Sequence, residues 1–108
     1  MPAERTRIEY GKLVRDRIPE MIASEGYVPE VRTLDADEYR AELDRKLREE
    51  TEEFLESKSV EELADILEVI DALCVAYGHT HEEMHRIQKE KRAARGGFDL
   101  HAYLIAKR

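Results

Sequence analysis

The chain contains no tryptophan, a single cysteine, three prolines and five glycines among its 108 residues. One cysteine cannot form an internal disulfide, so a reducing compartment suits this protein. The few prolines and glycines leave little sequence for long loops. The N-terminus has no apolar signal-peptide core, and no apolar run approaches the ~20 residues that a membrane span needs. These absences predict a soluble, cytoplasmic protein built mainly from regular secondary structure.

Charged residues make up 40% of the chain and apolar residues 42%, so the apolar content suffices for one modest core. We therefore expect a single domain over residues 1–108. The formal net charge of −7 argues against non-specific binding to nucleic acid or anionic membranes, since both need a basic surface. A small anionic ligand is compatible with this charge where metal ions or a local basic patch offset it.

Three segments carry a helix start signal, in which a capping side chain is followed three residues later by glutamate. The pairs are Asp35 and Glu38, Ser59 and Glu62, and Thr80 and Glu83. They predict helices over about residues 36–56, 60–77 and 81–95. Gly78 and Gly96–Gly97 provide stops for the last two helices.

The ends of the chain are less regular than its middle. Pro19 suits the first turn of a short helix that ends near Gly26. Residues 27–34 are expected to be extended, and the tail 98–108 fits either a strand or a last helical turn. The sequence thus predicts an all-α, antiparallel helical bundle with three main helices and a short N-terminal helix.

Two predicted helices carry acidic residues where apolar ones belong. In the first, Leu43, Leu47 and Phe54 fall on one line, and Glu50 takes a position of that line. Glu53, three residues further on, flanks the same stripe. These two glutamates are therefore expected to approach the core.

The second long helix is apolar on nearly every side between residues 63 and 76. Glu62 shares a line with Val69, and so does Asp65, so both acids sit on faces expected to be buried. Cys74 lies in the same apolar run, which indicates a buried thiol in the core rather than a nucleophile.

A helix that is apolar all round must be covered on every side, and one short chain can hardly do that. We therefore expect a homodimer.

Burying an unpaired carboxylate costs several kcal/mol, so such groups require a cation or a proton. The second helix has no lysine or arginine between Val60 and Tyr77. A hard divalent cation such as Mg²⁺ prefers oxygen ligands, and i, i+3 spacing puts both acids of each pair on one helix face. A single E-x-x-E pair is most often a solvated helix surface; two pairs that both intrude on apolar stripes fit a metal site as well as they fit a solvated surface.

At these acids the sequence resembles the MazG-like, all-α NTP pyrophosphatase superfamily, whose hallmark is E-x-x-E, a spacer and E-x-x-D. The matching acids are Glu50, Glu53, Glu62 and Asp65, and Glu49 competes with Glu50 for the first place. The opening GKLVRDRIPEMI and the closing KEKRAARGGF resemble a compact branch labelled phosphoribosyl-ATP pyrophosphohydrolase-like, proposed as house-cleaning enzymes. The resemblance extends from about Lys12 to Phe98.

The resemblance implies that the four acids bind Mg²⁺, with Mn²⁺ as the alternative ion. It also implies cleavage between the α and β phosphates of a nucleoside triphosphate, which yields a monophosphate and pyrophosphate. A carboxylate not fully used by metal could orient or deprotonate water, and Glu53 is the first choice for this role, followed by Glu49. Base, sugar and phosphate preference, and the number of metal ions, are not encoded in these motifs.

Basic residues would offset the remaining phosphate charge. They form two groups, one near the N-terminus and one before Gly96, and Lys91 is the most suggestive because it continues an apolar line. The candidates are Lys12, Arg15, Arg17, Lys89, Lys91, Arg92 and Arg95. For the others, a solvated surface charge explains each residue about as well.

Two other functions compete with this interpretation. Residues 81–85 match the H-E-x-x-H pattern of zinc proteases, but they begin a helix in charged surroundings, with only His101 as a further ligand downstream. We therefore interpret them as surface histidines. The stronger alternative is a non-enzymatic helical interaction module, in which the acids only keep long helices soluble.

Overall fold

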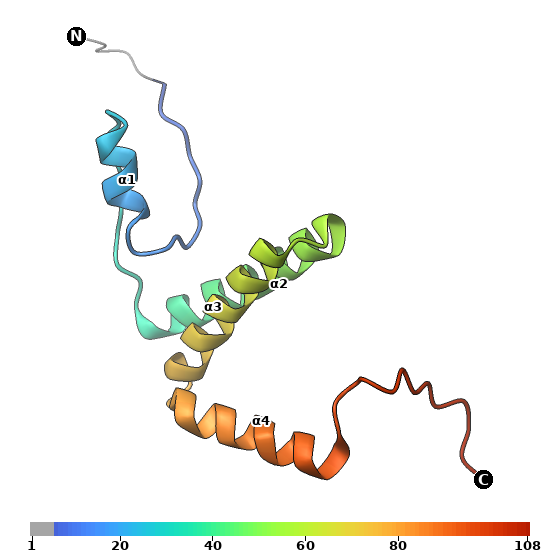
Figure 1. The fold of residues 1–108 in the computed structure, drawn as a ribbon. Coiled ribbons are helices and arrows are strands. Elements are labelled where there is room, and N and C mark those ends of the chain that lie inside the picture. The colour runs from blue at the N-terminus through green and yellow to red at the C-terminus, as the bar shows by residue number, and fades with distance from the viewer. Residues whose placement is uncertain (1–5) are drawn as a thin grey trace. The chain divides into compact units, whose positions relative to one another are not determined.

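The computed structural model describes residues 6–108 and is all-helical over that range, as predicted. No strand is present in the described part of the chain. Figure 1 shows the four helices in chain order. Their bounds are Ile18–Ser24 for α1, Ala36–Ser57 for α2, Val60–Ala76 for α3 and His81–Arg95 for α4.

The chain divides into two compact units between Ile70 and Asp71, within α3. The first unit contains α1, α2 and the first part of α3. The second contains the end of α3, then α4 and the tail. The single domain over residues 1–108 stays a prediction, and so does the assembly of the helices into one bundle.

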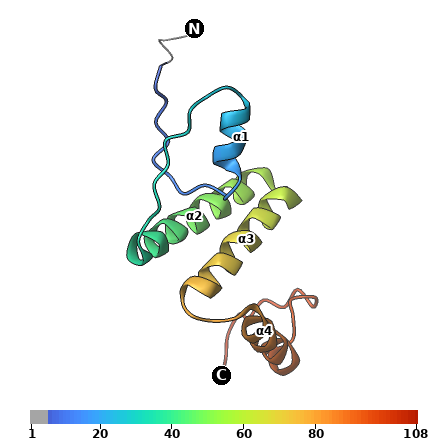
Figure 2. The same cartoon turned by 90° about the vertical axis from the view of Figure 1, so that its left-hand side faces the viewer.

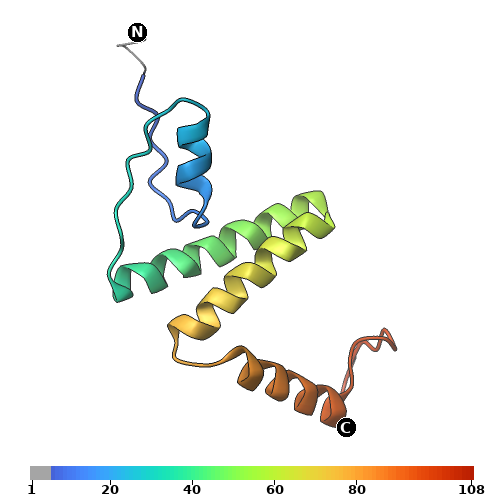
Figure 3. The same ribbon diagram turned by 60° about the vertical axis from the view of Figure 1, so that its left-hand side comes forward.

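In the first unit, α2 and α3 form an antiparallel hairpin with a two-residue connection (Figures 2 and 3). The turn closes because Lys58 adopts a left-handed conformation with φ 56° and donates its N–H to the carbonyl of Phe54 at 2.7 Å. The hydroxyl of Ser59 then accepts from the N–H of Glu62 at 3.4 Å, as the predicted cap requires. The hairpin therefore places the last residues of α2 beside the first residues of α3.

The helix starts follow the predicted side-chain caps. Asp35 accepts from the N–H of Glu38 at 2.8 Å, while the Glu38 carboxylate accepts from the N–H of Asp35 at 3.3 Å. This reciprocal capping box satisfies two N–H groups that otherwise lack helical partners. At α4, the hydroxyl of Thr80 accepts from the N–H of Glu83 at 3.1 Å.

Removing the N-cap of α2 tests how much this capping interaction contributes to the stability of the fold. Asp35→Ala should lower the free energy of unfolding by about 1 kcal/mol, because the N–H of Glu38 loses its acceptor. Urea denaturation followed by circular dichroism measures the change. Asp44→Ala removes the same side chain from the middle of α2 and should shift stability by less than about 0.5 kcal/mol. Equal effects of the two substitutions would contradict the capping role.

The second unit begins with the end of α3, where Gly78 has φ 83°. Its N–H bonds to the carbonyl of Val75 and that of His79 to the carbonyl of Cys74, both at 3.0 Å, which together form a Schellman stop. Cys74 is 8% exposed, and its thiol donates to the carbonyl of Thr80 at 3.3 Å. The thiol is therefore a buried structural group, as predicted.

The residues after α4 form neither a strand nor a helix, so both predictions for the tail were wrong. Gly96 ends α4 as predicted, with φ 82°. The side chains of Phe98, Leu100 and Tyr103 are at least 89% exposed, so the tail has no apolar surface to pack against within its unit. A periodic apolar pattern without a covering partner does not stabilise regular structure.

The apolar core of the described residues is small. Leu43 of α2 is 3% exposed and Val69 of α3 is 7% exposed, whereas Leu67 of α3 remains 61% exposed. Val69 lies on the face of α3 that also carries Glu62 and Asp65, as the periodicity predicted. None of the four helices in residues 6–108 combines the length and apolar character needed to cross a bilayer.

Candidate metal centre

Three carboxylates converge across the α2–α3 hairpin. Each of Glu50, Glu62 and Asp65 offers one oxygen, and these oxygens lie within 4.8 Å of one another. Glu50 comes from α2, while Glu62 and Asp65 come from one face of α3 at i, i+3 spacing. We call these three residues the carboxylate triad. Three of the four ligands predicted from sequence are thus brought to one point.

Glu50 is the buried member of the triad. It is 7% exposed overall, and its side chain retains 10% of its accessible surface. The Oε2 atoms of Glu50 and Glu62 are both buried and have no hydrogen-bond partner. Buried carboxylate oxygens without donors carry a large desolvation cost, which a cation or a proton would offset.

The triad environment disfavours negative charge. Burial raises the pKa of Glu50, and the neighbouring charge of Glu53 raises it further. Burial also raises the pKa of Glu62 to about 7, with contributions from hydrogen bonding to Glu50 and from the charge of Glu53. In the absence of metal, Glu50 and Glu62 therefore hold protons at pH values where ordinary glutamates are ionised.

The fourth predicted ligand, Glu53, neighbours the triad. Hydrogen bonding to Glu53 and the charge of Glu53 both raise the pKa of Glu62, and the same charge raises the pKa of Glu50. Glu53 is exposed, and its oxygens are not among those that converge. Glu49, the competing candidate, lies 3.6 Å from Lys46 and 3.9 Å from Lys12 through Oε1. Its carboxylate is directed to these ammonium groups, which leaves Glu50 in the ligand position.

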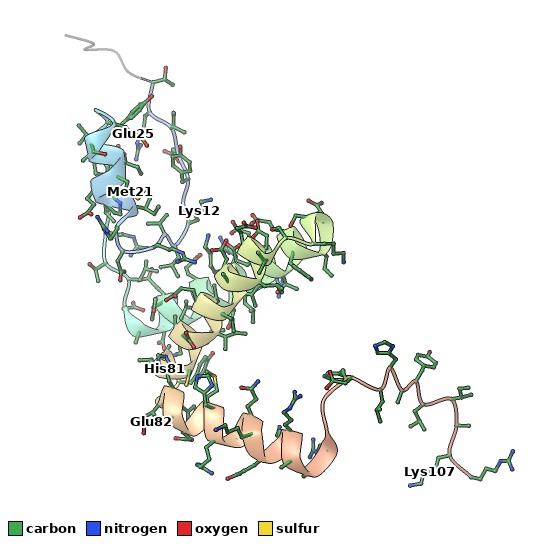
Figure 4. All side chains as sticks on the ribbon, in the orientation of Figure 1. Lys12, Met21, Glu25, His81, Glu82 and Lys107 are labelled. Carbon is green, nitrogen blue, oxygen red and sulfur yellow. The ribbon has the colours of Figure 1, made fainter. Side chains whose placement is uncertain are left out.

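Three cations lie against the acids of the hairpin. Lys46 is 3.6 Å from Glu50 Oε1, and Arg15 Nη2 donates to Asp65 Oδ1 at 2.6 Å. Lys12 lies on the irregular segment before α1 (Figure 4), as does Arg15. Two of the basic residues predicted to bind phosphate are therefore in contact with the acids.

The other predicted phosphate contacts are not at the triad or cannot be placed there. Arg17, the residue before α1, pairs through Nε with Glu20 at 2.7 Å, and its side chain is 84% exposed. The remaining four lie on exposed positions of α4, in the second unit. They are Lys89, Lys91, Arg92 and Arg95. Arg92 pairs with Asp99 at 3.6 Å.

The H-E-x-x-H histidines do not form a metal site in the described residues. His81 Nε2 lies 3.3 Å from the carbonyl oxygen of Asp71, and His79, which precedes the motif, pairs through Nδ1 with Glu83 at 3.0 Å. Across residues 6–108, the group of ligand-type side chains that converges contains no histidine.

Sequence reasoning missed the direct pairing of Arg15 with Asp65, because the two residues are 50 positions apart. Helical periodicity does not predict which helix face an irregular segment contacts 50 positions away in the sequence. The contact of Lys46 with Glu50 carried a usable signal, since the two residues stand at i, i+4 on one helix.

A surface hollow lies on α2, lined by Asp44, Leu47, Arg48, Thr51 and Glu52. It contains none of the four predicted ligands and is formed by one helix. It does not resemble an enclosed substrate pocket, so we assign it no chemical role.

Comparison with known proteins gives a partial match. No family model and no solved structure matches the chain. A stretch of 42 residues is 60% identical to a protein of Mycolicibacterium smegmatis described as uncharacterized. The match covers 39% of this chain and 43% of that protein, so it spans less than half of either.

The carboxylate triad could hold a metal ion. Its donors are all oxygens, and the unpartnered buried Oε2 atoms supply the lone pairs that a hard cation needs. Carboxylate groups in this arrangement suit Mg²⁺, Mn²⁺ or Ca²⁺ better than softer ions.

The raised pKa values predict how metal-free stability depends on pH. Because Glu62 titrates near 7 when folded and near 4.5 when unfolded, its favourable contribution is complete below about pH 4.5. That contribution is lost as pH rises through about 7. In the presence of a chelator, the urea midpoint should therefore fall between about pH 5 and about pH 8, and Glu62→Gln should flatten this fall. Parallel curves for parent and variant would contradict the assignment.

Proposed function

We propose that this chain is an Mg²⁺-dependent nucleoside triphosphate pyrophosphohydrolase. It would cleave between the α and β phosphates and act on non-canonical nucleotides as a house-cleaning enzyme. The observation that supports this most directly is the burial of Glu50, which is 7% exposed and converges with Glu62 and Asp65. Its buried Oε2 has no hydrogen-bond partner. The order of acids along the chain, which resembles the MazG-like pattern, supports the reaction class.

The acids of the α2–α3 hairpin would have separate roles in this reaction. When bound, Mg²⁺ supplies charge neutralisation at the phosphate oxygens and makes water more acidic. Glu50, Glu62 and Asp65 would hold the ion. Glu53 is exposed beside the triad, and in this proposal its carboxylate would orient a water or accept its proton. Glu49 is the less suitable base because two lysines flank it.

The basic groups of the first unit supply the phosphate contacts in this proposal. Lys12 and Arg15 lie on one irregular segment and already contact acids of the hairpin. A triphosphate carried by divalent cations would add anionic oxygens next to them. The four α4 cations stay predicted contacts.

We also propose that the chain acts as a homodimer. Leu63 and Leu67 of α3 are 44% and 61% exposed, and Val75 further along is 60% exposed. A soluble helix rarely leaves such residues to solvent without a partner surface. The same exposure is what favours the alternative function, a non-enzymatic interaction module. Multi-angle light scattering measures the mass, and a monomer at micromolar concentration would contradict dimerisation.

A panel of normal and damaged nucleoside triphosphates tests the reaction class. With Mg²⁺ present, each nucleotide is incubated with the protein, and pyrophosphate and orthophosphate are measured separately. The proposal expects pyrophosphate with the matching nucleoside monophosphate, and no product with a chelator. Orthophosphate release, or no turnover of any nucleotide, would favour the interaction module.

A further inference from the structure

Arg15 forms an ion pair with a carboxylate that would also be a metal ligand. Its Nη2 lies 2.6 Å from Asp65 Oδ1, and Asp65 belongs to the triad. The two side chains are 56% and 39% exposed, so the pair is accessible to solvent and to incoming ions. The other cation on the triad, Lys46, belongs to α2 itself and contacts Glu50 at 3.6 Å.

We infer that Arg15 changes partner during the reaction cycle: it neutralises Asp65 before a divalent ion binds and pairs with the substrate triphosphate afterwards. This inference rests on the proposed function. A divalent cation held by Asp65 would lie close to the guanidinium, and like charges at that separation repel. Metal binding and the Arg15–Asp65 pair therefore compete.

The position of Arg15 in the chain allows such an exchange. It lies in the irregular segment before α1, where its carbonyl accepts from the N–H of Ile18 at 3.1 Å. The backbone is thus anchored to the start of the helix, while the side chain is 56% exposed and donates to Asp65. Moving the guanidinium breaks no helical hydrogen bond.

Charge balance explains why Arg15 would pair with the triphosphate after the metal binds. Once a divalent ion replaces it on Asp65, the guanidinium has lost its counter-ion next to a site that is about to receive a polyanion. The planar guanidinium presents paired donors that match phosphate oxygens, and a flexible ammonium does not. Arg15 would then hold the triphosphate beside the triad.

Two titrations test this exchange in the full chain. In the first, Mn²⁺ alone is titrated and followed by electron paramagnetic resonance. In the second, the Mn²⁺ complex of inorganic triphosphate is titrated by calorimetry, which removes any dependence on the base. For Arg15→Gln, we expect Mn²⁺ alone to bind about 3- to 10-fold more tightly. The triphosphate complex should bind at least about 10-fold more weakly.

Arg7→Gln is the matched control, because Arg7 carries the same charge on the same irregular segment and pairs with Glu9 and Glu30 instead. It should change each affinity by less than about 2-fold. Arg15→Lys should restore Mn²⁺ affinity close to that of the parent and recover triphosphate binding only in part. Circular dichroism melts confirm that each variant is folded.

Opposite signs for the two affinities distinguish this inference from a structural role, which would weaken both or neither. Unchanged or weaker Mn²⁺ binding by Arg15→Gln would overturn it, and so would unchanged binding of the triphosphate complex. A parent protein that binds no Mn²⁺ would instead contradict the proposed function itself, so the two failures are separable.

Discussion

Glu50→Gln should reduce pyrophosphate release by about 10²- to 10³-fold, the scale seen when a group that stabilises transition-state charge is removed. The substitution keeps the size of the side chain and removes one negative charge from the most buried position of the triad. Initial rates with saturating Mg²⁺ and the best nucleotide of the panel provide the measurement. Asp65→Asn should have an effect of similar size.

Controls for this result lie on the same helices. Glu52→Gln on α2 and Glu68→Gln on α3 make the same change of charge at exposed positions outside the triad. Both should retain activity within about 3-fold of the parent, because exposed charges at that distance are largely screened. Losses as large as that of Glu50→Gln would indicate a general charge effect rather than a ligand role.

Mg²⁺ should stabilise the parent protein strongly and the Glu50→Gln variant hardly at all. An ion at 100 times its Kd adds about 2.7 kcal/mol to the free energy of unfolding, which corresponds to a Tm rise of about 10 °C or more in a domain of this size. The variant should start from metal-free stability at least equal to that of the parent, because it removes a buried charge beside Glu53 and Asp65. Thermal melts with and without Mg²⁺ measure both effects.

Sodium chloride at matched ionic strength separates specific binding from screening in this experiment. Glu52→Gln should keep the full response to Mg²⁺. A clear loss of metal-free stability in both Glu50→Gln and Asp65→Asn would show that these carboxylates contribute to folding rather than to ion binding.

The predicted helices agree with the structure because their signals are local. Capping residues such as Asp35 and Thr80 fix helix starts through contacts three residues away, and Gly78 fixes an end through its own backbone conformation. The tail lacked such signals, and its apolar residues suggested regular structure that the chain alone does not support.

The candidate site was predicted from the mismatch between acids and apolar stripes. Glu50 is buried on the line of Leu43, as expected, and α3 presents Glu62 and Asp65 from one face. The exposure of Glu53 did not follow from that pattern, because flanking a stripe does not determine burial. The pairing of Arg15 with Asp65 depends on how an irregular segment lies on a helix, and side-chain periodicity does not encode it.

Calorimetric titration of Mg²⁺ into metal-free protein tests the central claim most directly, since it requires neither a substrate nor turnover. The parent and Glu52→Gln should show the same saturable binding, and Glu50→Gln should lose it or weaken it by at least about 10-fold. Equal binding by the parent and Glu50→Gln, or no binding by the parent, would contradict a metal site at the carboxylate triad.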